Sequence, residues 1–139
     1  MSAPLGRIYQ GLAGLILFGL LVQFYFAGVG LFGAGPMTYH RALGNLLWLL
    51  TVLPVLVALA GRLGRRRIGH AVLLLALMTL QIALPSLRDS ASLVAALHPV
   101  NALALLAISY VMVRPRASTR SEPSAMSRTP VSHAATGHD

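Results

Sequence analysis

The chain has 139 residues, of which 56% are hydrophobic and only 10% are charged. That balance excludes an ordinary soluble domain, in which about 25% of residues are charged. The apolar residues come in blocks long enough to cross a bilayer, since a membrane helix needs about 20 of them. We therefore predict one small integral membrane domain, an all-α four-helix bundle whose main partner is the lipid bilayer.

The net charge of +8 comes from 11 arginines and no lysine, opposed only by Asp89, Glu122 and Asp139. A basic balance can indicate nucleic-acid binding. Here the arginines stand at the ends of apolar blocks, with no aromatic residues among them to stack on bases. Membrane orientation explains them better, and we expect no nucleic-acid partner. The absence of cysteine excludes disulfides, thiolate metal sites and cysteine nucleophiles.

Four membrane spans are expected within residues 1–113, at about 8–32, 37–60, 70–87 and 91–113. An arginine-rich loop over 61–69 separates the second span from the third, and Pro54 and Pro99 are expected to interrupt helices. Residues 114–139 are rich in Ser, Thr and Pro, which predicts a disordered cytoplasmic tail. No internal repeat is evident.

The arginines also predict the orientation of the spans. Nine of them lie beside the N-terminus, in the 61–69 loop or after the fourth span, whereas only Arg41 and Arg88 lie at the opposite ends of the helices. Because positive residues are enriched on the cytoplasmic side, we expect a multi-pass protein of the cell membrane with both termini in the cytoplasm. His40 then lies at the outer end of the second span, and His98 lies roughly 10 Å into the fourth.

Polar side chains are concentrated in the outer half of this predicted bundle. They are Gln23, His40, Arg41, Asn45, Gln81, His98 and Asn101. A polar group in the membrane costs a few kcal/mol on insertion scales and usually faces an interior partner or cavity. Their concentration in one half predicts one site.

Two histidines from non-adjacent helices are typical axial ligands of haem iron, and bundle cores commonly hold such sites. Gly44 follows His40 by one helical turn and leaves room for a flat macrocycle, and Asn101 follows His98 by one turn. Arg41 at the membrane surface is suited to pair with haem propionates. We therefore predict haem b as cofactor, with His40 and His98 as the metal ligands.

The sequence Tyr39-His40-Arg41, followed by a small and apolar helix and by a second histidine in the fourth span, resembles one four-helix half of haem A synthase. It is similar, more loosely, to four-helix b-type membrane cytochromes. The resemblance implies that His40 and His98 hold a haem, and that two such bundles lie side by side in a homodimer or larger membrane complex. Met37 replaces the glutamate that this family carries three residues before the first histidine, which argues against haem A synthesis itself.

A structural interpretation stays open beside the haem interpretation. His40 could hydrogen-bond a loop, and His98 with Asn101 could cross-link the bundle near Pro99. The protein would then be a cofactor-free accessory subunit or a small-ligand permeation unit. No acidic residue lies inside any predicted span, so paired-carboxylate acid–base chemistry has no candidate residues, and we expect no enzymatic activity of that kind.

Overall fold

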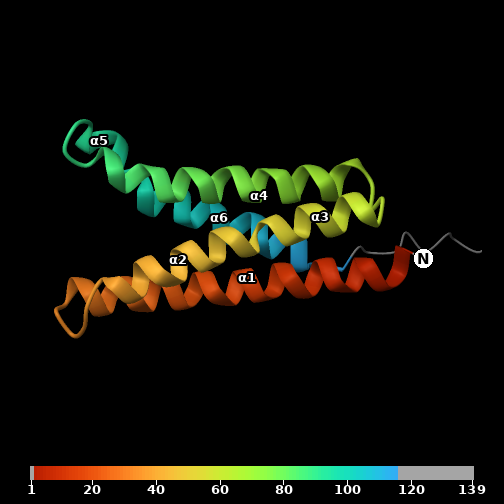
Figure 1. The fold of residues 1–139 in the computed structure, drawn as a ribbon, viewed down its shortest axis with the longest axis horizontal. Coiled ribbons are helices and arrows are strands. Elements are labelled where there is room, and N and C mark those ends of the chain that lie inside the picture. The colour runs from red at the N-terminus through yellow and green to blue at the C-terminus, as the bar shows by residue number, and fades with distance from the viewer. Residues whose placement is uncertain (1, 116–139) are drawn as a thin grey trace, which may run out of the picture.

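The computed structural model describes residues 2–115, and this part of the chain is helical throughout its regular elements. Four segments are long and apolar enough to cross a membrane: Pro4–Leu31, Thr38–Ala60, Arg65–Leu87 and Ser92–Val113. They lie side by side as a four-helix bundle (Figure 1). The protein is therefore a small membrane protein with the predicted all-α architecture. The tail predicted to be disordered falls, beyond residue 115, outside the described residues.

The first span is the single helix α1 (Ser2–Leu31), and the others are built from shorter elements. The second span consists of α2 (Thr38–Leu50) and α3 (Val52–Ala60), and the third of α4 (Arg65–Ala83) and the 3-10 turn η1 (Leu84–Leu87). The fourth span consists of α5 (Ser92–Ala95) and α6 (His98–Val113). Helix α1 packs against α2, α3 and α6, and α4 packs against α2, α3 and α6.

Local sequence explains where α1 ends. Gly33 has a φ of 69°, the left-handed conformation that glycine adopts without steric cost. The amide of Ala34 donates to the carbonyl of Val29 at 2.9 Å, and that of Gly33 donates to the carbonyl of Gly30 at 3.4 Å. These two bonds form a Schellman motif, which satisfies carbonyls left open at the helix end.

Helix α3 ends in the same motif with an arginine in the left-handed position. The amide of Leu63 donates to the carbonyl of Ala58, and that of Arg62 donates to the carbonyl of Leu59, both at 3.0 Å. Arg62 has a φ of 46°, which is strained for a residue with a Cβ atom. Buried Leu63 anchors the turn against the core.

Prolines account for the interruptions within spans. Pro54 lacks the N–H that would reach the carbonyl of Leu50, and the second span breaks nearby at Thr51. The Thr51 hydroxyl donates to the carbonyl of Trp48 at 2.6 Å, so the break carries its own side-chain bond. In the fourth span Pro99 occupies the first turn of α6, and the helix restarts at His98.

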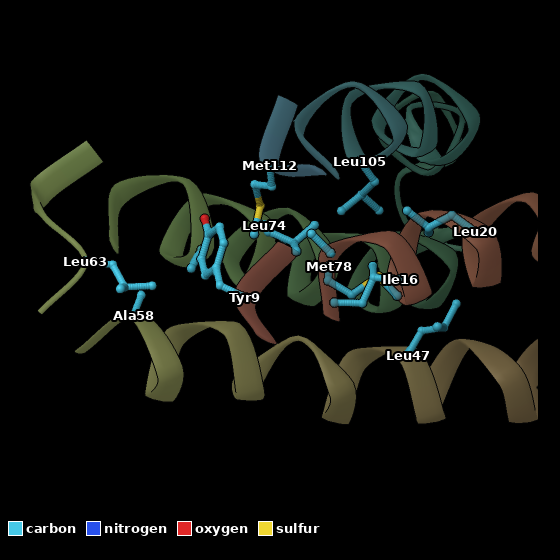
Figure 2. Packing of buried hydrophobic residues seen from close by; sticks show 12 residues of the cluster. Tyr9, Ile16, Leu20, Leu47, Ala58, Leu63, Leu74, Met78, Leu105 and Met112 are labelled. Carbon is cyan, nitrogen blue, oxygen red and sulfur yellow. The ribbon is translucent and has the colours of Figure 1, made fainter. Parts of the chain in front are cut away.

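All four spans contribute to a buried apolar cluster in the interior of the bundle (Figure 2). Its members are Tyr9, Ala13, Ile16, Leu20, Leu47, Ala58, Leu63, Ala71, Leu74, Met78, Leu105 and Met112. Lipid is as apolar as these side chains, so burying them against one another removes no apolar surface from water. Membrane helices are instead held together by close packing. Gly19 shows how close this packing is, because a Cβ added there would lie 2.5 Å from Leu47 Cδ2.

Two helices begin earlier in the chain than the predicted spans. The third span begins at Arg65 rather than near His70, because the Schellman motif and Gly64, with a φ of 90°, complete the turn within four residues. Three of the four arginines assigned to the loop over 61–69 therefore lie in the first turn of α4. Helix α1 likewise begins at Ser2, before the predicted start of the first span at Ile8, since nothing between these residues stops helical hydrogen bonding.

Candidate functional site

A cavity of about 430 Å³ lies between the four spans, near the α1–α2 turn and η1, in the size range of small-molecule sites. Its lining is mostly apolar, with polar groups from every span. The lining residues are Leu20, Gln23, Phe24, Ala27, His40, Arg41, Gly44, Asn45, Met78, Gln81, Ile82, Pro85, His98, Pro99 and Ala102. Six of the seven polar residues expected to share a site are among them.

Helix α2 carries His40 on its first turn, and α1 fixes the orientation of its ring. His40 Nδ1 lies 3.1 Å from the backbone carbonyl oxygen of Gln23. A carbonyl oxygen can only accept, so Nδ1 carries the proton and donates. The lone pair of the neutral ring is then on Nε2, the nitrogen that histidine commonly offers to a metal.

His98 is held in the same way by the third span. Its Nδ1 donates to the backbone carbonyl of Gln81 at 3.0 Å. Pro85 explains why this carbonyl is open: it stands four residues after Gln81 and has no N–H to complete the helical bond. His98 therefore also has its proton on Nδ1 and its lone pair on Nε2.

The free nitrogen of His98 is covered by a side chain. Gln81 Nε2 lies 3.1 Å from His98 Nε2 and donates to it. The Gln81 Oε1 atom accepts from Asn101 Nδ2 at 2.6 Å, and Asn101 Nδ2 also lies 2.9 Å from the carbonyl of Leu77. The network of His98, Gln81 and Asn101 thus links α4 to α6 without a cofactor.

Asn101 is not among the residues that line the cavity. It is 7% exposed and lies behind Gln81, where it holds the amide that covers His98. The sequence spacing correctly placed Asn101 near His98. It did not show that both side chains form hydrogen bonds with Gln81. The sequence did hold one sign of this role for Gln81. Pro85 has no N–H, so the carbonyl four residues earlier, that of Gln81, has no helical donor and is free to accept another hydrogen bond.

Gly44 lines the cavity, but a glutamine amide occupies the space beside it. A Cβ added at Gly44 would lie 2.7 Å from Gln23 Nε2, so the glycine permits the amide to lie against α2. Gln23 Oε1 is buried without a hydrogen-bond partner. Arg41 also lines the cavity and is exposed.

The two histidine rings meet across the cavity. Their centroids are 6.2 Å apart with an interplanar angle of 64°. A metal ion between two imidazoles places each nitrogen about 2.0 Å from the metal and each centroid about 1.2 Å further, or about 6.4 Å in total. No cluster of three or more His, Cys, Asp or Glu occurs among residues 2–115. A metal held by this pair would therefore need its remaining ligands from another source, such as a macrocycle.

Comparison with known proteins finds a single family likeness, and that family has no known function. No curated protein and no solved structure matches the chain. Residues 23–87, which include Gln23, His40, Arg41, Gly44 and Gln81 but not His98, are similar to a family of unknown function (DUF6220).

Proposed function

We propose that the protein binds a b-type haem between His40 and His98, inside the membrane, for electron transfer or haem handling. The observation that carries this proposal is the histidine pair itself. Two rings from α2 and α6 stand 6.2 Å apart in one cavity, and a backbone carbonyl holds each Nδ1 proton. Hydrogen bonds of this kind orient histidines for metal ligation.

The cavity also has features that suit a macrocycle. Gly44, Ala27 and Ala102 are small residues on its wall, and large apolar residues complete it. Arg41 at the edge offers a planar guanidinium that can pair with carboxylates while they stay near water. Bound there, a haem supplies reversible one-electron chemistry.

The chain's own residues have distinct roles in this proposal. His40 and His98 offer Nε2 lone pairs, and the carbonyls of Gln23 and Gln81 keep the protons on the opposite nitrogens. The Gln81 amide must leave His98 Nε2 before that atom can bind iron. The likeness of residues around His40 and His98 to one half of haem A synthase agrees with this assignment, while Met37 separates the chain from haem A synthesis.

The test is the reduced-minus-oxidised visible spectrum of detergent-purified protein produced with adequate haem. We expect a sharp haem spectrum that His40→Ala and His98→Ala each strongly change, because each variant loses one of the two ligands. His70→Ala is the matched control, because His70 lies in the first half of α4 and does not line the cavity. A folded protein that stays colourless after haem is added would overturn the proposal.

A cofactor-free bundle is the second candidate, and the closed network of His98, Gln81 and Asn101 favours it. In that case the wild-type protein has no visible absorbance, and His98→Ala lowers only the midpoint of unfolding. The same purified variants therefore separate an accessory membrane subunit from a haem protein.

A further inference from the structure

The cavity is built from two sets of residues separated by a constant distance along the chain. Except for Asn45, each lining residue has a counterpart 58 positions away that also lines the cavity. Gln23 corresponds to Gln81 and His40 to His98, with the same residue type at both places. The constant shift needs no insertion or deletion, even across the connections between helices.

The same shift relates the buried core. Ala13 corresponds to Ala71 and Leu47 to Leu105, and each of these four side chains is nearly or fully buried. Fully buried Thr51 corresponds to fully buried Ser109, and both are small hydroxyl residues. These correspondences run against the expectation that the chain has no internal repeat. Few identical residues reveal the repeat, because different apolar side chains fill equivalent positions.

Packing follows the repeat as well. The first hairpin is α1 with α2 and α3, and the second is α4 with α6. Helix α1 packs on α6 of the other hairpin, as α4 packs on α2 and α3. Helices α1 and α4 run in the same direction, as Figure 1 shows. Two hairpins arranged in this way are related by a two-fold axis along the bundle, the parallel kind of membrane repeat.

Contacts between equivalent residues locate that axis, because two such residues can touch only on it. Tyr9 and Arg67, which are 58 positions apart, meet at one end, where the Tyr9 hydroxyl donates to the Arg67 carbonyl at 2.9 Å. His40 and His98 meet at the other end. Their bonds to Gln23 and Gln81 are equivalent too, at 3.1 and 3.0 Å.

We propose that the protein is a tandem repeat of two helical hairpins, and that the cavity on their two-fold axis takes a flat ligand whose two faces are chemically equivalent, one facing His40 and the other His98. The part concerning the ligand rests on the proposed haem function, and the repeat does not. The ligand centre is symmetric, as in a planar metal macrocycle. Each hairpin provides half of the site.

Some positions related by the 58-residue shift carry different residue types, and these positions indicate how the two edges of the ligand differ. Arg41 and Asn45 on α2 correspond to Pro99 and Leu103 on α6. One edge of the cavity is therefore cationic and polar and the equivalent edge is apolar. A ligand with a symmetric centre, an acidic edge and an apolar edge fits this arrangement in one orientation.

One further departure explains the two glutamine conformations. Gly44 leaves space for the Gln23 amide, which would be 2.7 Å from a Cβ at that position. Its counterpart is Ala102, whose Cβ fills the equivalent space on α6. The Gln81 amide therefore lies over His98 Nε2 instead. The two hairpins therefore provide equivalent histidines, but only His98 has a glutamine amide hydrogen-bonded to its Nε2 atom.

Spin-label distances test the repeat without any ligand. The chain has no cysteine, so labels can be attached at introduced cysteines alone. Leu15 with Val111 and Leu73 with Leu53 are equivalent pairs that link the two hairpins, and all four side chains are exposed on the outside of the bundle. We expect the two pairs to give coincident distance distributions by double electron–electron resonance. Means that differ by several ångströms would overturn the repeat.

Haem titration tests the equivalence of the two faces. His40→Ala and His98→Ala should shift the spectrum in the same way, and added imidazole should restore both. Their haem affinities should agree within about 20-fold, because one hydrogen bond in a membrane protein, such as the Gln81 cover, changes affinity by up to about 18-fold. A larger difference would overturn the equivalence while haem binding itself stands. If the wild-type protein binds no haem, the proposed function and the ligand part fail, and coincident spin-label distances still support the repeat.

Discussion

Replacing Gln81 by leucine tests whether the Gln81 side chain blocks His98 Nε2 from binding a ligand or helps His98 to bind one. The substitution removes the 3.1 Å bond from Gln81 Nε2 to His98 Nε2 and keeps the backbone carbonyl that holds His98 Nδ1. In the haem proposal the covering bond must open before Nε2 binds iron. Its removal should therefore increase haem affinity.

The expected increase in haem affinity follows from the free energy of one hydrogen bond. Hydrogen bonds between membrane helices average about 0.6 kcal/mol and reach about 1.7 kcal/mol, which corresponds to about 3- to 18-fold in affinity. Asn101 keeps its bond to the carbonyl of Leu77 at 2.9 Å, so the loss of its other acceptor should lower stability only modestly. Gln81→Leu should thus bind haem several-fold more tightly and unfold slightly more easily.

The assay is a titration of detergent-purified apoprotein with haem, followed by the growth of the bound spectrum. Thr79→Val is the matched control, because it also removes a side-chain bond between helices, the one from Trp48 Nε1 on α2 to Thr79 Oγ1 on α4, which lies outside the cavity. The control should bind haem like the wild type. Unchanged or weaker haem binding by Gln81→Leu would refute the covering role.

Three further substitutions follow from close contacts and backbone conformation. Gly44→Ala should lower haem affinity severalfold in the same titration, because the new Cβ displaces the Gln23 amide towards the cavity; unaltered affinity would contradict this. Gly19→Val should destabilise the bundle by about 1–3 kcal/mol in unfolding measurements, because it overpacks against Leu47. Arg62→Gly should stabilise it by about 1 kcal/mol, since glycine adopts a φ of 46° without strain; a fall in the unfolding midpoint would show that the arginine side chain contributes more than the strain.

The apolar blocks alone were enough to predict four spans, because a bilayer imposes both the length and the helical state of what crosses it. The clustering of polar groups was also predictable from depth, since His40, Gln81 and His98 fall at similar levels when successive spans alternate in direction. These residues do line one cavity. Depth, however, does not determine which face of a helix a side chain occupies, and Asn101, at a similar depth, is not among the lining residues.

Hydrogen-bond partners and the repeat were harder to predict. The role of Gln81 depends on Pro85 and on the rotation of α4 relative to α6, and only the first of these can be seen in the sequence. The repeat was hidden because a membrane core accepts many apolar residues at one position. Only Gln23 with Gln81 and His40 with His98 repeat a polar identity among the cavity residues. The start of α4 depended on a left-handed arginine, a conformation that sequence rules reserve for glycine or asparagine.

The helix interruptions give the two ends of the bundle different mechanical properties. Around the cavity, α4 gives way to a 3-10 turn at Leu84, α5 is a single turn, and α6 starts afresh at His98. Short elements open locally at lower free energy than long continuous helices. Among the described residues 2–115, amide hydrogen exchange should therefore be faster from residue 84 to residue 97 than along the middle of α1. This end of the bundle would then open locally while the packed core between Ala13 and Leu74 stays closed, which gives the proposed ligand a route into the cavity.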